Sequence, residues 1–253
     1  MDLRRLIIYG AFYIPYGIHK ITRTGAFGPD GMVPLYGPIP SDGNPLKAAL
    51  IKHQVKQFHE ASCSVATVVS VINAIRDSQG ETVAPITQMD ILEKVRTANW
   101  KERMSAGGDN GKRGLPLSVL EAITRSSLDA YGIRYDTLEA VQARKEPDQA
   151  KIIKEVLWQR LDDFEKKGNC LIIAHFDQGA YVPDLNIPHI SPVGSFDREK
   201  GMVTVLDVDP FQENPYQVRF DTFYRGLSSN YLNVLKPFGF NSGGYIYIKL
   251  SAS

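Results

Sequence analysis

Apolar positions recur at helical intervals in the first two thirds of the chain and at strand intervals in the last third. From Cys63 to Ile75 nearly every position is apolar, and a helix without a polar face belongs in the middle of a domain. The spacing predicts further helices over residues 87–95, 115–123 and 152–167, and strands over 171–175, 190–196, 202–208 and 245–250. Helices followed by antiparallel strands predict an α+β fold.

The pattern also divides the chain. Residues 1–50 are rich in Pro, Gly and Tyr, which predicts an extended N-terminal arm around a globular body. Residues 51–253 then form one domain, with a helical part over about 51–167 and a sheet part over about 168–253. The glycine-containing segment 105–114 lacks the spacing of a phosphate-binding loop, so it is predicted to be a surface loop.

Charge and hydropathy narrow the function classes. The net charge is +1, from 29 basic and 28 acidic residues, which predicts no nucleic-acid partner because such proteins carry basic patches. No apolar run reaches 18 residues, so no membrane-spanning helix is expected. The short apolar run 6–15 follows Arg4 and Arg5 and is interrupted by tyrosines. A structured arm and a cytoplasmic location are favoured; a targeting segment would instead make the protein periplasmic or membrane-associated.

The chain has two cysteines, Cys63 and Cys170, too few for a disulfide framework or a four-thiolate metal site. Any cysteine chemistry is therefore that of a single residue. Cys63 opens the apolar helix, where the helix dipole lowers a thiol pKa from its usual ~8.5. Gln57 lies six residues earlier; its side-chain amide and the Cys63 backbone N–H are predicted to face one point and to hold an oxyanion there.

The thiolate needs a base, and hairpin geometry selects one of the five histidines. Residues 197–201 are predicted to form the turn between two strands. A turn centred near residue 198 makes His189 and Asp207 cross-strand neighbours on one face, where a carboxylate can orient an imidazole. A slip of one residue would place them on opposite faces. Singly, each of these residues is more often structural, so the joint pattern carries the interpretation.

Three segments resemble the phytochelatin synthase family, a branch of the papain-like cysteine peptidase superfamily. They are residues 57–74, the string Pro188-His189-Ile190-Ser191-Pro192-Val193-Gly194, and Leu206-Asp207-Val208. The resemblance implies a papain-like α+β fold with Cys63 as nucleophile, His189 as base, Asp207 as orienting carboxylate and Gln57 as oxyanion donor.

The resemblance also implies an activity. Family members attack the Cys–Gly bond of glutathione, release glycine and hold γ-glutamylcysteine as a thioester, which passes to a second glutathione or to water. The chain ends soon after the similar region, without a cysteine-rich tail, so hydrolysis or weak transpeptidation is expected. No cofactor or metal site is expected, although ions such as Cd²⁺ can stimulate through metal–thiolate substrates. The expected partner is glutathione or a related thiol peptide, and a homodimer is compatible with the sequence.

Three departures from the family pattern bear on the substrate. Asp209-Pro210-Phe211-Gln212 replaces Ala-Arg-aromatic-Lys, Gly243-Gly244-Tyr245 lacks a preceding arginine, and Glu60-Ala61-Ser62-Cys63 replaces Glu-Pro-aromatic-Cys. The α-carboxylate of a γ-glutamyl group needs a cationic partner, for which Lys112, Arg113 and Arg225 are the candidates. Two alternatives stay open: a leader-peptide type cysteine peptidase, and a catalytically dead papain-like binding protein.

Overall fold

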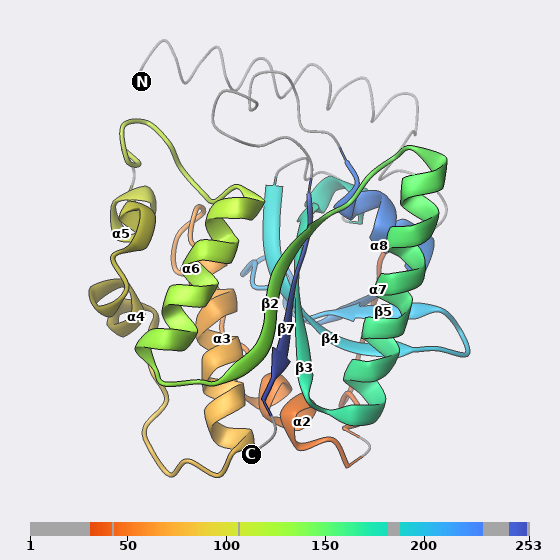
Figure 1. The fold of residues 1–253 in the computed structure, drawn as a ribbon, viewed down its shortest axis with the longest axis horizontal. Coiled ribbons are helices and arrows are strands. Elements are labelled where there is room, and N and C mark those ends of the chain that lie inside the picture. Colours follow the sequence, from red (N-terminus) through yellow and green to blue (C-terminus); the bar gives the residue numbers. More distant parts are fainter. Residues whose placement is uncertain (1–30, 42, 106, 182–187, 230–242, 252–253) are drawn as a thin grey trace.

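Seven strands pair antiparallel in one sheet, in the order β1-β6-β5-β4-β3-β7-β2 (Figure 1). The computed structural model describes residues 31–41, 43–105, 107–181, 188–229 and 243–251. The strands are β1 Val33–Pro34, β2 Tyr135–Gln142, β3 Cys170–Asp177, β4 Pro188–Asp197, β5 Met202–Val205, β6 Tyr216–Arg219 and β7 Gly244–Leu250. Strand β3 is buried along almost its whole length, as expected of a strand covered on both faces.

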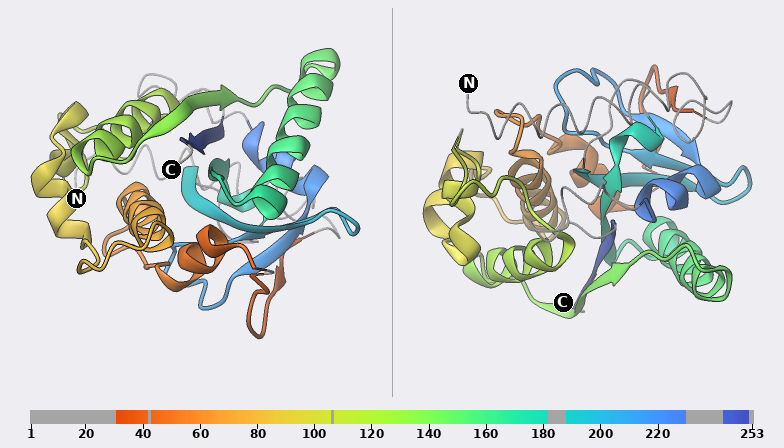
Figure 2. Two further views of the ribbon diagram at one scale, coloured as in Figure 1. Left: turned by 60° about the horizontal axis from the view of Figure 1, so that its bottom comes forward. Right: turned by 90° about the horizontal axis from the view of Figure 1, so that it is seen from above.

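Helices cover the sheet from both sides. They are α2 Pro45–Lys52, α3 Cys63–Ser78, α4 Gln88–Lys94, α5 Trp100–Arg103, α6 Leu117–Ala130, α7 Pro147–Lys167 and α8 Phe220–Leu227, with short 3₁₀ turns η2 Thr97–Asn99 and η3 Gln178–Ala180. Helix α3 packs on β4 and α6 on β2 and β7, whereas α7 packs on β3 and β4, and α8 on β3, β5 and β6. Figure 2 shows the two groups of helices on opposite sides of the sheet. The α+β prediction is confirmed.

Helix α3 confirms the prediction made from its composition. Every residue from Cys63 to Ile75 is buried, and the helix contacts α2, α4, α6 and β4. A helix surrounded in this way needs no polar face. Its first residue, Cys63, is consequently held in place by the packing of the helix.

Two segments differ from the sequence prediction. Helix α2 starts at Pro45, inside the stretch expected to be an extended arm, because Asn44 caps it by accepting from Lys47 N (2.9 Å) and proline suits the first helical turn. Residues 1–30 of that arm lie outside the described part of the chain. Strand β2 interrupts the region expected to be helical, since pairing with β7 at the sheet edge outweighs local propensity.

The predicted strand over 202–208 is shorter than expected, because β5 ends at Val205. Strand β6 and helix α8 follow it and were not predicted. Among the helices of the described ranges, none combines the length and the apolar character needed to cross a bilayer.

Candidate active site

Cys63 is the first residue of α3 and is 7 % exposed. A tight turn leads into it: Ser62 N donates to His59 O (2.9 Å), and Ser62 Oγ accepts from His59 N (2.9 Å). The next residue is held as well, since Trp100 Nε1 donates to Ser64 Oγ (3.0 Å). The sulfur therefore stands at a fixed point at the helix N-terminus.

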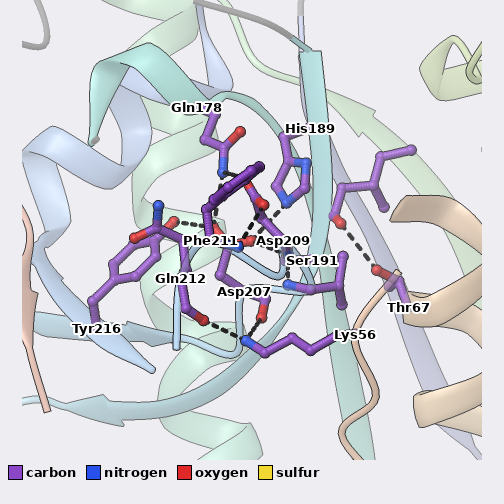
Figure 3. Close-up of polar contacts among 12 residues, drawn as sticks. Lys56, Thr67, Gln178, His189, Ser191, Asp207, Asp209, Phe211, Gln212 and Tyr216 are labelled. Atoms are coloured by element: carbon purple, nitrogen blue, oxygen red, sulfur yellow. Dashed lines mark hydrogen bonds and ion pairs between the residues drawn. The ribbon is translucent and has the colours of Figure 1, made fainter. Parts of the chain in front are cut away.

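His189, on β4, joins this cysteine to Asp207. Its Nε2 donates to Asp207 Oδ1 (2.7 Å; Figure 3), and its side chain also interacts with that of Cys63. Both His189 and Asp207 are buried. The edge of Phe176 packs against the imidazole ring, with ring centroids 5.5 Å apart. The structure thus brings together three of the four residues predicted for the site.

The way in which Asp207 reaches His189 differs from the prediction. The hairpin pairs Asp197 with Met202, but the register shifts by one residue between Val193 and Ser195. Asp207 lies beyond the end of β5, beside Ser191, whose Oγ accepts from Val208 N (3.3 Å). The predicted direct pairing of His189 with Asp207 is therefore wrong.

The register shift preserves the predicted face. Ser191 and His189 are two residues apart on β4, so they point to the same side of the sheet. Without the bulge at Gly194, Asp207 would lie opposite Pro192 and face away from His189. Glycine is required there, because a Cβ on Gly194 would lie 2.5 Å from Leu206 Cγ.

Four hydrogen bonds hold the Asp207 carboxylate. Besides His189, Asp209 N donates to Oδ1 (2.8 Å), and both Tyr216 Oη (2.7 Å) and Gln178 Nε2 (3.3 Å) donate to Oδ2 (Figure 3). Burial alone would raise the pKa of Asp207, but the charge of His189 and these hydrogen bonds lower it. The carboxylate is therefore ionised at neutral pH.

The pairing with Asp207 also shifts the pKa of His189. Burial would lower the pKa of His189, but the Asp207 carboxylate and the contact with Cys63 raise it to about 10. Burial also raises the pKa of Tyr216 well above its usual value, so its hydroxyl remains a donor to Asp207. The site therefore holds an imidazolium next to the cysteine sulfur at neutral pH.

Gln57 lies on a segment that is fastened to the Asp207 side of the site. Its backbone N donates to Val208 O (2.8 Å), and the ammonium of Lys56 bridges Asp207 O (2.7 Å) and Gln212 O (2.5 Å). The Gln57 Oε1 atom is buried and has no partner among the described residues. The backbone of Gln57 is thus held beside Val208, and among the described residues no hydrogen bond joins its side chain to Cys63.

The remaining candidates have other environments. Cys170 is in the core on β3, where burial raises its pKa to about 11. Burial lowers the pKa of His175 to about 4, and its Nε2 donates to Leu115 O (3.0 Å). His53 pairs with Asp77 (3.1 Å). His189 is the described histidine whose ring interacts with a cysteine and hydrogen-bonds with a buried carboxylate.

Tyr216 and Gln178 were not found from the sequence. Tyr216 is on the short strand β6 and Gln178 in the turn η3, and neither belongs to a motif. The link of Tyr216 to Asp207 depends on the pairing of the short strands β5 and β6, and that of Gln178 joins residues 29 positions apart. In the described ranges, no group of three or more His, Cys, Asp or Glu side chains is placed to hold a metal ion.

A buried helix that starts with a cysteine, packed on an antiparallel sheet that presents histidine and aspartate to it, defines the papain-like class of cysteine enzyme folds. The family model for phytochelatin synthase matches residues 45–240, most of the chain, and the chain belongs to the phytochelatin synthase family. No curated protein matches it in sequence. Membership confirms the papain-like fold and implies an acyltransferase or peptidase-like enzyme for glutathione-type substrates.

Proposed function

We propose that the protein cleaves the Cys–Gly amide bond of glutathione through a γ-glutamylcysteinyl thioester on Cys63. The observation that carries the proposal is the series from Cys63 to His189, with which it interacts, and from His189 through a 2.7 Å hydrogen bond to the buried Asp207. In a family that acts on glutathione-type substrates, such a series supplies a nucleophile, a proton carrier and an orienting charge.

In the first half-reaction, the deprotonated Cys63 sulfur attacks the carbonyl carbon of the substrate cysteine. The resulting oxyanion is stabilised by the Cys63 backbone N–H and the Gln57 side-chain amide. The His189 imidazolium gives its proton to the glycine nitrogen, the C–N bond breaks and glycine leaves. His189 is then neutral, and the acyl group is bound to sulfur.

In the second half-reaction, His189 takes a proton from the incoming acceptor. Water yields free γ-glutamylcysteine; the amino group of a second glutathione yields (γ-Glu-Cys)₂-Gly. Either acceptor displaces the Cys63 thiolate from the acyl group. His189 keeps the proton that it took from the acceptor, so the imidazolium of the starting state is restored. Hydrolysis is the main outcome we propose, with transpeptidation at high glutathione concentration.

Asp207 fixes the imidazole so that one ring nitrogen faces the sulfur throughout. Its four hydrogen bonds leave the carboxylate little freedom to rotate. An orienting carboxylate of this kind also favours the imidazolium form. A metal ion enters only as part of a thiolate complex of the substrate.

The experiment is product analysis by mass spectrometry after incubation with glutathione, with and without Cd²⁺. Wild type and Cys170→Ala should release glycine and γ-glutamylcysteine, whereas Cys63→Ala should release neither, and His189→Ala should be nearly inactive. Absence of product from wild type would overturn the proposal. Cleavage of a leader peptide by that same preparation would then identify a peptidase, and no cleavage at all a binding protein.

A further inference from the structure

The loop over residues 107–115 lies against the turn that precedes Cys63. Arg113 Nη2 forms an ion pair with Glu60 Oε1 (2.5 Å). Glu60 is part of the turn closed by the bond from Ser62 N to His59 O, three residues before the cysteine. A guanidinium group is therefore attached directly to the segment that carries the proposed nucleophile.

Neighbouring contacts fix this loop in place. Leu115 O accepts from His175 Nε2 (3.0 Å), and Gly114 O accepts from Arg103 Nη1 (3.4 Å). Gly108 has a φ of +66°, and a Cβ there would lie 2.8 Å from Arg113 Cγ. The stem of Arg113 is consequently held by the backbone around it.

The guanidinium has unused binding capacity. Its Nε is buried and has no hydrogen-bond partner among the described residues, and a buried donor left unpaired is costly. The Arg113 side chain is 27 % exposed, and that of Glu60 is 66 % exposed. A carboxylate that arrives from solvent can bind the guanidinium through two parallel hydrogen bonds, while Glu60 turns into water.

We propose that Arg113 binds the α-carboxylate of the γ-glutamyl group, with Glu60 as the counter-ion that this carboxylate displaces. The inference rests on the proposed function and names the residue that selects its substrate. A γ-glutamylcysteinyl group extends roughly 8 Å from its thioester carbon, on the length of an extended chain. Glu60, which is paired with Arg113, lies three residues before Cys63, so their Cα atoms are at most about 11 Å apart, which is comparable to that reach.

The ion pair with the nucleophile turn distinguishes Arg113 from the other two cations considered. Lys112 is exposed, and its backbone bonds to Asp109. Arg225 lies on α8 and also has a buried Nε without a partner in the described ranges, but no described ion pair joins it to residues 59–63. Lys112→Gln and Arg225→Gln serve as controls for Arg113→Gln, because each substitution removes the same single positive charge.

The first test does not depend on turnover of glutathione. The Cys170→Ala variant leaves Cys63 as the remaining cysteine of the sequence. In this background, the rate at which Cys63 is alkylated is measured with 4-(iodoacetamido)butanoate and, separately, with its neutral amide. The reagents share one length and differ in the terminal charge. Arg113→Gln should lower the ratio of the alkylation rate with the acid to that with the amide about tenfold. This is the effect expected from the loss of one charge-assisted hydrogen bond. Glu60→Gln should raise the ratio, and Lys112→Gln should change it less than twofold.

An unchanged ratio in Arg113→Gln, or an equal fall in Arg225→Gln, would overturn the inference. The second test compares kcat/KM for glutathione with that for 4-aminobutyryl-Cys-Gly, which lacks the α-carboxylate. Arg113→Gln should lose about tenfold or more on glutathione and almost nothing on the analogue, and Arg113→Lys should recover part of the loss. If wild type cleaves neither peptide, the proposed function fails, and the alkylation ratio still decides the role of Arg113.

Discussion

The two flanks of Cys63 are built differently. On the sheet side, the Asp207 carboxylate accepts four hydrogen bonds and is buried together with His189. Around this carboxylate and on the loop over residues 107–115, three buried atoms have no partner among the described residues: Gln57 Oε1, Gln178 Oε1 and Arg113 Nε.

The difference in hydrogen bonding corresponds to two tasks, proton transfer and substrate binding. A proton carrier has to keep one orientation through the whole reaction, so its supports are complete before the substrate arrives. Groups that bind a substrate keep unused hydrogen-bonding capacity until it is bound. Variants of the sheet side should therefore change rate and pH dependence, and variants of the loop side should change the response to the substrate's own groups.

The largest effect of breaking the sheet side is expected for Asp207→Asn, which should lower kcat/KM by roughly a thousandfold or more. The variant also loses a pH-dependent contribution to stability. The pKa of His189 is raised from 6.5 to about 10, so its contribution is complete below pH 6.5 and disappears as the pH rises through 10. Asp207 has its pKa lowered from 3.8, so its contribution is present above that pH and is lost as the pH falls further.

Thermal unfolding measured across pH tests this directly. The melting temperature of wild type should exceed that of Asp207→Asn most strongly between about pH 4 and 6.5, and the difference should shrink towards pH 10. Asp77→Asn, which breaks the more exposed pair with His53, is the control. A difference that stays constant from pH 5 to 10 would show that His189 and Asp207 are not coupled as described.

In the segment that precedes Cys63, Gln57→Ala should lower kcat about a hundredfold with little change in KM, because an oxyanion donor acts mainly in the transition state. Gln79→Ala, at the other end of α3, should leave both constants unchanged. Steady-state kinetics with glutathione decides. A raised KM with kcat preserved would assign Gln57 to ground-state binding instead.

The bulge in β4 sets the position of Asp207 relative to His189, and Gly194→Ala should disturb it. The added Cβ would lie 2.5 Å from Leu206 Cγ, and overpacking of this kind costs about 2 kcal/mol of unfolding free energy. Activity should fall about tenfold, because Leu206 directly precedes Asp207 and a shift of Leu206 moves the orienting carboxylate. Adding Leu206→Ala should restore part of both losses. Gly107→Ala, whose Cβ meets nothing within 4 Å, is the control.

The smallest effect is expected for Tyr216→Phe, which removes one of the four donors to Asp207. The loss should cost about 1 kcal/mol of stability. It should also raise the pKa of Asp207, so the acidic limb of the kcat/KM profile moves to higher pH. Tyr181→Phe removes a buried hydroxyl that donates to Phe223 O (2.7 Å) instead, so it should cost similar stability and leave the profile in place.

Much of this site could be predicted from the sequence, because local signals specify it. The segment from Cys63, which is apolar on nearly every helix face, predicted the buried helix, and the turn residues 197–201 predicted the hairpin that the structure shows. The face shared by His189 and Asp207 was predicted as well, although the path to it was wrong. A bulge inserts one residue, and the strand pattern alone does not locate it.

The missed elements depend on distant partners. Strand β2 pairs with β7 more than a hundred residues away. The contact of Tyr216 with Asp207 spans nine positions, but it forms only because the short strand β6 pairs with β5. The ion pair of Arg113 with Glu60 likewise joins residues that are 53 positions apart. Such contacts are set by the folding of the whole sheet and its loops, so a local window of sequence carries no sign of them.

The most direct test of the central claim is to trap the acyl-enzyme. Wild type, Cys170→Ala and Cys63→Ala are mixed with excess glutathione, quenched in acid within the first turnover and examined by intact-protein and peptide mass spectrometry. A γ-glutamylcysteinyl adduct should appear on the peptide that contains Cys63 in the first two proteins and be absent from the third. Glycine release without an adduct on Cys63, or an adduct on Cys170, would contradict the account.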